Sequence, residues 1–447
     1  MRFLVKTRAP LLILGDLILF YGALLLMLLV RYQELSPDTL SLHLPPFTIS
    51  AVIWIFVFFI GGLYEIKALR TNDQFYNKFL ALIAICAALM SVMFYLIPTF
   101  GITPKMNLLI FVGLFTVLDY FWRILFNAIV SMSAPQTKIL MLGSNRSAEE
   151  LIGHLKENPH LGYEISLWMR DGLHDKTAND LKELIQSNHI NLIVVPAHIK
   201  KNHQFARIVY QGLQGGVEVI SLADLFETVF QKVSLSELEE TWFLEHVPTR
   251  NTQDSAARRF FEIFAAALFL IISLPIQLLA ALATKLTSRG PVFYVQKRVG
   301  RGGIVFHLYK FRSMYNSTDL NPDAASGQPT WTTENDKRIT PIGRILRATH
   351  IDELPQLINI MKGEMSFVGP RPERPEFTEE LEKQIPFYEL RYLLRPGITG
   401  WAQINFRYAA SVDEAYEKLQ YDIYYLKNRS FFMDVLITLK TIKKIFQ

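Results

Sequence analysis

The chain has 447 residues, a length that predicts about three structural units of roughly 150 residues each. Half of the residues are hydrophobic, 19% are charged and the mean hydropathy is +0.20, which excludes a disordered chain and is too apolar for an ordinary soluble enzyme. The net charge of +5 does not favour nucleic acid as a partner and suits an anionic membrane surface or a phosphorylated substrate. The single cysteine, Cys86, excludes an internal disulfide framework and a cysteine-based zinc site.

Four apolar runs occupy the first third of the chain, and each is long enough to cross a hydrocarbon core of about 30 Å. They cover residues 10–30, about 47–64, 79–100 and 106–130. Basic residues precede the first run and lie between the second and third, so the positive-inside rule places both ends of a four-helix transmembrane bundle, residues 1–133, in the cytoplasm. Asp119 and Arg123 are four residues apart and can pair on one helix face, which favours a structural role for these charges.

A fifth apolar stretch, residues 263–283, has Pro275 near its middle. Proline removes a backbone donor there and clashes with the preceding helical turn. Basic pairs flank the stretch on both sides, and a spanning helix would carry one of them across the membrane. We therefore predict a re-entrant helix, about residues 257–287, that bends at Pro275 and returns to the cytoplasmic face. The alternative is a proline-kinked fifth span, which would place the last third of the chain outside the cell.

Residues 134–250 alternate between predicted strands and helices, the βαβ pattern of a Rossmann-like domain. The predicted strands are residues 138–143, 191–196 and 217–220. An amphipathic helix is predicted at residues 148–158. The segment that begins at Gly143 lacks the second and third glycines of the phosphate-binding fingerprint. We therefore expect a fold without a bound dinucleotide that serves regulation or assembly.

The remaining region, residues 251–447, continues after the re-entrant helix with a predicted β-hairpin. Its strands are residues 292–299 and 304–312, and its glycine-rich turn is residues 300–303. Because side chains alternate along a strand, Lys310 and Arg312 are expected on one face and Phe311 on the other. A long polar loop, residues 315–337, is a candidate for a mobile lid.

Residues 431–446 form the last predicted helix, which is amphipathic and carries lysines among aliphatic side chains. This pattern suits a helix in the cytoplasmic lipid interface, and it suits almost equally a helix packed on its own domain. Both alternatives stay open.

Two adjacent carboxylates, Asp352 and Glu353, stand out in the C-terminal region. A helix is predicted from about residue 349 or 352 to 362, with Gly363 as its stop. Because proline is tolerated only in a first turn, Pro355 places both carboxylates at the N-terminal end of this helix. One carboxylate can hold Mg²⁺ against phosphate oxygens, and the other can attack phosphorus to form an acyl phosphate.

Basic side chains accompany this pair. Arg371 lies between two prolines, which aims its planar guanidinium from a stiff turn. The other basic residues of the set are Lys310, Arg312, Arg344 and Arg347. Taken one by one, these features are more often structural than catalytic, since acidic residues favour a first helical turn and basic residues favour a solvated strand face. Together, beside a helix that dips into the membrane, they predict a phosphate-handling site.

Long motifs follow one another in this region. They are KFRSM (310–314), DKRITPIGRILR (336–347), DELPQLINIMKGEMSFVGPRP (352–372) and RPGITGWAQIN (395–405). With them, residues 256–447 resemble the bacterial sugar transferase family, the monotopic phosphoglycosyl transferases. The four apolar runs and the Rossmann-like region extend the resemblance to the large members of the family, the polyprenyl-phosphate hexose-1-phosphate transferases of the undecaprenyl-phosphate glucose or galactose phosphotransferase type.

The resemblance implies a two-step reaction on the cytoplasmic face of the bacterial inner membrane. Asp352 would attack the sugar-linked phosphorus of a UDP-hexose, expel UMP and pass the phosphosugar to undecaprenyl phosphate. Glu353 would be the carboxylate associated with Mg²⁺. Lys310, Arg347 and Arg371 would lie near the phosphates. Pro275 would be the break in the re-entrant helix. The reaction would be the first membrane step of exopolysaccharide, capsule or O-antigen assembly. Glucose and galactose are the first candidate sugars, and N-acetylated sugars stay open.

Two other functions stay open at this point. A direct nucleotide-sugar glycosyltransferase would release UDP instead of UMP, although the sequence lacks the Asp-X-Asp motif that often places its metal. A non-catalytic membrane regulator of polysaccharide assembly would release no nucleotide at all. Membrane lipids are expected partners and nucleic acid is not. A homodimer is a candidate assembly, and the oligomeric state stays open.

Overall fold

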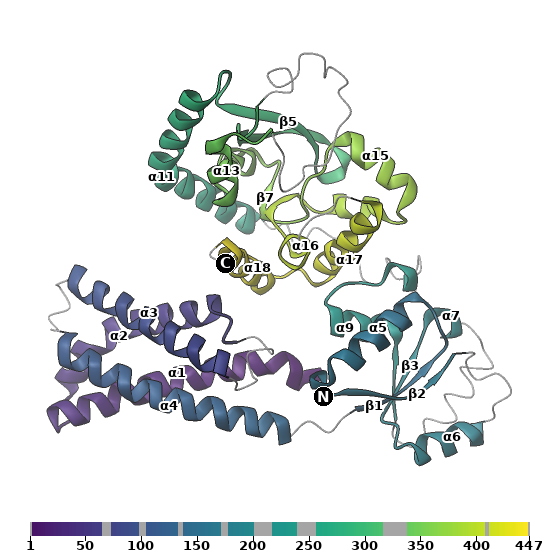
Figure 1. The fold of residues 1–447 in the computed structure, drawn as a ribbon, viewed down its shortest axis with the longest axis horizontal. Helices are drawn as coiled ribbons and strands as arrows, with labels where there is room; N and C mark the ends of the chain where they lie inside the picture. The colour runs from purple at the N-terminus through teal and green to yellow at the C-terminus, as the bar shows by residue number, and fades with distance from the viewer. Residues whose placement is uncertain are drawn as a thin grey trace. The chain divides into compact units, whose positions relative to one another are not determined.

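The computed structural model shows an all-helical first part followed by mixed α and β structure (Figure 1). It describes residues 2–64, 73–97, 104–132, 137–170, 178–200, 217–238, 256–315, 338–406 and 411–445. The chain divides into two compact units, Met1–Pro135 and Gln136–Gln447. The polar loop predicted to form a lid lies, apart from its first residue, outside the described residues.

The first unit consists of the helices α1 to α4, each long and apolar enough to cross a membrane. They cover Arg2–Tyr32, Pro37–Ile60, Asp73–Leu96 and Pro104–Met132. The second helix begins well before the predicted run, at Pro37 instead of about residue 47. The Ser36 hydroxyl caps it by accepting a hydrogen bond from Thr39 N–H at 3.2 Å, and proline is well suited to the first helical position.

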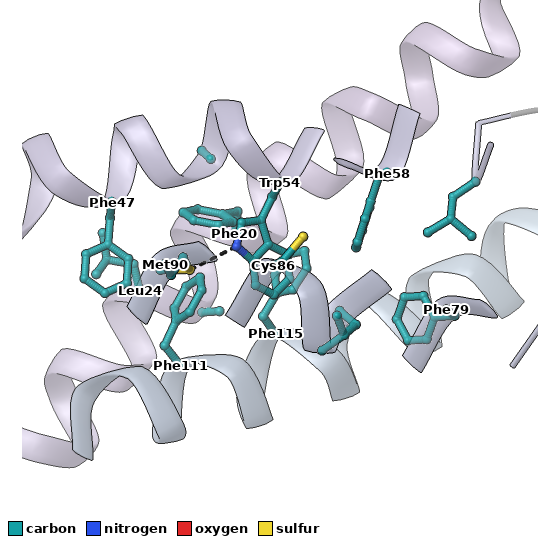
Figure 2. Packing of buried hydrophobic residues seen from close by; sticks show 14 of the residues in the cluster. Phe20, Leu24, Phe47, Trp54, Phe58, Phe79, Cys86, Met90, Phe111 and Phe115 are labelled. Carbon is teal, nitrogen blue, oxygen red and sulfur yellow. Dashed lines mark hydrogen bonds between the residues drawn. The ribbon is translucent and has the colours of Figure 1, made fainter. Parts of the chain in front are cut away.

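Aromatic side chains from all four helices fill the centre of this unit (Figure 2). The rings of Phe111 and Phe115 on α4 stack with their centroids 6.0 Å apart, and Phe20 of α1 meets both edge-on. The Trp54 indole N–H of α2 donates to Met90 Sδ of α3 at 2.9 Å. Aromatic pairs of this kind each contribute about 0.5–1.5 kcal/mol beyond their area burial, so the core specifies how the four helices pack.

A charged cluster lies in the same unit. Arg123 Nε donates to Asp119 Oδ2 at 3.0 Å, which confirms the predicted pair on α4. The same guanidinium donates to Asp16 of α1 at 2.8 Å and to the carbonyl oxygen of Leu63, just after α2, at 3.3 Å. Arg123 therefore ties three segments of the unit together.

The second unit begins with a four-stranded parallel sheet in the order β2-β1-β3-β4. The strands β1 to β4 cover Thr137–Leu142, Tyr163–Met169, Leu192–Val195 and Glu218–Ser221. Three of them confirm predicted strands. Strand β2 was not predicted, because it is a half-buried edge strand that mixes Glu164 and Ser166 with apolar residues.

Helices cover both faces of this sheet. The helices α5 (Arg146–Glu157) and α9 (Leu222–Phe230) pack on the face that carries Met141, and α6 (Ala178–Ser187) packs on the face that carries Leu142. Consecutive residues of β1 point to opposite faces, as the period of a strand requires. The short elements of this region are η3 (Pro159–Leu161), α7 (Ala197–Lys200) and η5 (Leu235–Glu237).

Helix α11 (Ala256–Thr287) contains Pro275 within its length, and its two halves run in different directions in Figure 1. It is the fifth described helix that is long and apolar enough to span a membrane. In its first half, Ala266 packs in a cluster with Ile360, and in its second half Ala280 packs in a cluster with Leu346. Both halves therefore contact the C-terminal region, whereas a straight helix of this length would extend about 48 Å.

The hairpin and a series of short elements follow α11. Strand β5 (Phe293–Val299) pairs antiparallel with β6 (Val305–Phe311), which confirms the predicted hairpin, and β7 (Ser366–Val368) pairs parallel with β8 (Gly397–Thr399). The other elements are η6 (Arg301–Gly303), α13 (Pro341–Ala348), η7 (Ile351–Glu353), α14 (Gln356–Lys362), α15 (Pro375–Gln384), η8 (Tyr388–Leu393), α16 (Trp401–Asn405), α17 (Val412–Asn428) and α18 (Phe431–Ile445).

The predicted start of the helix around the carboxylate pair is wrong. Asp352 and Glu353 lie in the 3₁₀ turn η7, and α14 begins only at Gln356, after Pro355. Proline has no N–H to extend the turn into the helix, so the two elements stay separate. The predicted stop is confirmed, because Gly363 ends α14 with a φ of 92°.

The C-terminal helix α18 packs on its own region through Ile437, which is fully buried. Its first residues, Phe431 and Phe432, remain 73% and 82% exposed. The helix thus has one face on the protein and an apolar end that the protein does not cover.

Candidate active site

Basic and acidic side chains predicted from distant motifs converge at η7. Lys310 Nζ, from β6, lies 2.7 Å from Glu353 Oε1. Arg371 NH2, from the turn after β7, lies 3.0 Å from the same oxygen. The structure thus brings a lysine and an arginine onto one carboxylate oxygen, directly beside Asp352, while the Arg371 side chain stays 40% exposed.

The two neighbouring carboxylates have different electrostatic surroundings. Burial opposes ionisation of Glu353, but the charges of Lys310 and Arg371 outweigh it and hold the pKa of Glu353 well below its usual range. Burial raises the pKa of Asp352, and Lys310 only partly offsets this effect. The charge of Glu353 raises the pKa of Asp352 further, whereas Arg347 acts in the opposite direction. Glu353 is therefore a fixed anion, and of the two neighbours Asp352 is the one whose charge the protein stabilises less.

Asp352 is only 7% exposed, yet no group in the described part of the chain donates a hydrogen bond to its carboxylate. A buried polar group without such partners is unfavourable for stability. It also keeps its oxygen lone pairs available to an electrophile. The Asp352 carboxylate is therefore free of hydrogen bonds from the described residues and available to react.

A left-handed residue sets the direction of the carboxylate pair. His350, with a φ of 56°, follows α13, and its N–H donates to the carbonyl oxygen of Arg347 at 3.3 Å. The chain then turns, and Glu353 N–H donates back to the His350 carbonyl at 3.1 Å. A non-glycine residue in this conformation costs of order 1–3 kcal/mol and persists where the surroundings impose it, often at functional sites.

A buried amide that the sequence analysis did not single out fixes the hairpin to α14. Asn359 Nδ2 donates to the His307 carbonyl at 2.7 Å, and its Oδ1 accepts from Tyr309 N–H at 3.2 Å. These bonds tie β6, and hence Lys310, to the helix that follows the carboxylate pair. An asparagine flanked by apolar helix residues is the only sequence signal that could have indicated this role.

Glycines let the Arg371 turn approach the segment after η8. A Cβ on Gly397 would lie 2.1 Å from Gly369 N, and a Cβ on Gly369 would lie 2.3 Å from the Arg395 carbonyl oxygen. The close packing permits two bonds, from Gly369 N–H to Thr399 O and from Gly397 N–H to Pro370 O, both at 2.9 Å. The motifs GPRP and RPGITG are therefore in direct backbone contact, which sets the position of Arg371.

Arg312 and Arg347 occupy different places. Arg312 is 4% exposed and donates to the carbonyl oxygens of Ser288 and Arg289, each at 2.8 Å. It therefore fastens the end of α11 to the hairpin and does not join Lys310 at the carboxylate pair, because β6 ends at Phe311 and the alternation of side chains ends with it. Arg347 lies in the last turn of α13, close enough to act on Asp352.

The carboxylate oxygens suit a magnesium ion that is also held by phosphate. Among the described residues no group of three or more His, Cys, Asp and Glu side chains could form a metal site alone. Glu353 uses Oε1 for both of its ion pairs, and in the same part of the chain neither its Oε2 nor the Asp352 carboxylate accepts a hydrogen bond. Mg²⁺ commonly takes one or two carboxylates and completes its six ligands with substrate phosphates and water, so this donor set fits it.

Comparison with known proteins shows which family the chain is similar to. Residues 253–447 match the profile of the family described as bacterial sugar transferase. The chain is 32% identical over 321 residues to the UDP-glucose:undecaprenyl-phosphate glucose-1-phosphate transferase of Escherichia coli K12. The aligned part covers 69% of this chain and 67% of that relative. The chain belongs to the bacterial sugar transferase family.

Other members of this sugar transferase family differ in the sugar that their names carry. The UDP-N-acetylgalactosamine-undecaprenyl-phosphate N-acetylgalactosaminephosphotransferase of Aeromonas hydrophila is 38% identical over 229 residues, or 51% of this chain and 52% of that relative. The undecaprenyl-phosphate glucose phosphotransferase of Komagataeibacter xylinus is 41% identical over 196 residues, or 43% of this chain and 36% of that relative. The matched part of this chain thus spans about half of the first of these relatives and about a third of the second.

Proposed function

We propose that the protein transfers a hexose-1-phosphate from a UDP-hexose to a polyprenyl phosphate, undecaprenyl phosphate in the first place. The observation that carries this proposal is the buried Asp352 carboxylate, free of hydrogen bonds from the described residues, beside a glutamate that holds a lysine and an arginine. The names of the relatives, which specify UDP-sugars and undecaprenyl phosphate, support the choice of substrates.

The reaction proceeds in two displacements at one phosphorus. A carboxylate oxygen of Asp352 forms a bond to the sugar-linked phosphorus, the bond from that phosphorus to the bridging oxygen breaks, and UMP leaves with the electron pair. A phosphate oxygen of the polyprenyl phosphate then attacks the phosphorus of the acyl phosphate, and Asp352 leaves as a carboxylate. The product is a polyprenyl-diphospho-sugar, the substrate for the first glycosyl transfer of exopolysaccharide, capsule or O-antigen assembly.

The surrounding residues have distinct roles in this scheme. Lys310 and Arg371 supply positive charge where phosphate oxygens gather, and Glu353 keeps both in position. Arg347 favours the ionised form of Asp352. Glu353, through Oε2, would hold Mg²⁺, which when bound would neutralise charge on the phosphate oxygens.

The membrane arrangement follows from where the substrates are. Undecaprenyl phosphate presents its phosphate at the lipid headgroups, and UDP-sugars are cytosolic. We infer that α1 to α4 form a four-helix transmembrane bundle. We also infer that residues 134–250, here called the α/β region, are Rossmann-like, and that α11 is re-entrant with its break at Pro275. The packing of both halves of α11 on one region supports the re-entrant form. The catalytic region then lies on the cytoplasmic face of the bacterial inner membrane.

Cysteine labelling tests this topology. Cys86 is buried and is the only native cysteine, so single cysteines can be placed in a Cys86→Ser background. We choose Leu35, between α1 and α2, Glu157, the last residue of α5, and Ile304, in the hairpin turn. We expect a membrane-impermeant maleimide to label Glu157→Cys and Ile304→Cys only in inverted vesicles, and Leu35→Cys only in right-side-out vesicles. Labelling of Ile304→Cys on the same side as Leu35→Cys would establish the fifth span and overturn the proposed topology.

The leaving nucleotide tests the reaction. With undecaprenyl phosphate and a panel of UDP-glucose, UDP-galactose and their N-acetylated forms, we expect the purified protein to release UMP with at least one donor. The direct glycosyltransferase predicts UDP, and the non-catalytic regulator predicts neither nucleotide. Release of UDP alone, or of no nucleotide with any donor, would exclude the proposed function.

A further inference from the structure

The backbone of the Arg371 turn is held by two other arginines. Arg391 NH2, from η8, donates to the carbonyl oxygen of Arg371 at 2.9 Å. Arg298 NH1, from β5, donates to the carbonyl oxygen of Pro372 at 2.9 Å. Two consecutive carbonyls of the turn thus accept charge-assisted bonds, which are roughly twice as strong as neutral ones.

Arg391 is itself fixed from the side of α17. It is 6% exposed, its NH2 lies 3.1 Å from Asp422 Oδ2, and its NH1 donates to the Tyr388 hydroxyl. Asp422 is 3% exposed, so its charge has to be matched by a nearby cation. The same Arg391 nitrogen, NH2, thus forms an ion pair with Asp422 and donates to the Arg371 carbonyl oxygen.

A parallel contact fixes the residue after Pro372. Glu373 pairs with Lys418 of α17, and Arg298 NH1 lies 3.7 Å from Glu373 Oε2. The Glu373 carbonyl accepts from Val299 N–H at 2.9 Å. Arg371 is therefore held by η8, Pro372 by β5, and Glu373 by β5 and α17. Helix α17 takes part in two of these attachments, through Asp422, which pairs with Arg391, and through Lys418, which pairs with Glu373.

Helix α17 is in turn braced by the α/β region. Lys232, buried just after α9, lies 2.8 Å from Glu150 of α5 and 3.1 Å from Glu417 of α17. Lys427 of α17 lies 2.7 Å from Glu227 of α9. The α/β region thus contacts the same helix that holds the Arg371 turn.

We propose that Arg391 and Asp422 are positioning residues for Arg371, and that α17 transmits the support of the α/β region to the phosphate-binding turn. The proposal rests on the proposed function, because Arg371 is taken to act on the phosphates. It gives the α/β region a role that needs no ligand: this region holds α17 so that the guanidinium of Arg371 stays directed at Glu353 and the substrate. Arg371 touches the substrate, whereas Arg391 and Asp422 act only through it.

The test is a double-mutant cycle on the full-length protein in nanodiscs, with UMP release as the readout. Asp422→Asn and Arg391→Lys are each expected to lower kcat/KM for the UDP-sugar about tenfold. In an Arg371→Lys background, each is expected to cost less than twofold, because the group that they position is already gone. Lys232→Met is expected to act in the same direction with a smaller loss, about threefold.

Glu376→Gln is the matched control, since it breaks a half-exposed ion pair with Arg374, 3.5 Å long, in the segment just after Arg371. It should stay within twofold of the wild type. Tyr388→Phe removes only the hydroxyl that accepts from Arg391 and provides a milder variant in case Asp422→Asn does not fold.

Two results would overturn the positioning role. One is an unchanged kcat/KM in Arg391→Lys together with an unchanged kcat/KM in Asp422→Asn, or in Tyr388→Phe if Asp422→Asn does not fold. The other is an equal loss in the wild-type and Arg371→Lys backgrounds, which would indicate a general effect on stability. Absence of UMP release by the wild type would instead refute the proposed function, so the two failures are distinguishable.

Discussion

Replacing Asp352 with Asn is expected to abolish turnover, with a loss in kcat on the order of 10⁴-fold or more, the scale on which removal of a catalytic nucleophile acts. The amide has the same shape but no negative charge, and its nitrogen lone pair is delocalised into the carbonyl, so it is too weak a nucleophile to attack phosphorus. When wild-type protein is incubated with the UDP-sugar and no acceptor, intact-mass spectrometry should show an adduct of one phosphohexose. The variant should show none.

The same substitution is expected to leave the fold intact and to stabilise it slightly. Burial raises the pKa of Asp352, so the folded protein binds the proton more tightly than the unfolded chain, and the ionised form lowers stability at neutral pH. Asparagine removes this unfavourable charge and loses no hydrogen bond to the described residues. The variant should have a higher unfolding temperature than the wild type at pH 7. This difference should vanish below the usual aspartate pKa of 3.8, where the Asp352 side chain is neutral in both the folded and the unfolded protein.

Asp413→Asn, in the exposed first turn of α17, is the matched control and should keep both turnover and the adduct. An adduct of the same mass on Asp352→Asn, or turnover within tenfold of the wild type, would remove Asp352 from the mechanism. Loss of the adduct together with a strong fall in unfolding temperature would point to a structural role instead.

The sequence was sufficient for the parts of the fold that local patterns determine. Alternation and the glycine-rich turn predicted the hairpin that carries Lys310, and Gly363 predicted the end of α14. Where the pattern was less regular, the prediction failed: η7 separates Asp352 from the helix because of Pro355, and the half-buried β2 has no clear alternation. Local features such as a turn or a helix end were thus easier to predict than the exact residue at which a helix or strand begins.

Side-chain direction at long range was beyond the sequence. Nothing near Arg312 indicates that it turns to the carbonyls at the end of α11, and nothing near Arg391 indicates that it holds the Arg371 turn. These contacts join segments that are brought together only by the packing of complete elements. The candidate site could therefore be predicted as a set of charges, but not as the arrangement that directs two of them to Glu353.

Replacing Arg123 with Met is expected to destabilise the first unit by about 3–5 kcal/mol, the usual result of removing one partner of a buried ion pair. Asp16 and Asp119 are 3% and 0% exposed, and both would remain buried without their counter-charge. The contact with the Leu63 carbonyl would also be lost. The measurement is the unfolding temperature of the full-length protein in detergent, together with the yield of folded protein.

Compensation separates this structural role from a functional one. Converting Asp16 and Asp119 to Asn in the Arg123→Met background removes the two orphaned charges, so the triple variant should regain most of the lost stability. Its UMP release per folded molecule should match that of the wild type, because the cluster lies in a different unit from the candidate active site. A triple variant that is stable but inactive would show that these three charges take part in function. A triple variant that stays unstable would show that Arg123 stabilises the helices mainly through packing. The first explanation would then be its contact with the Phe58 ring, whose centroid lies 5.3 Å from the guanidinium carbon.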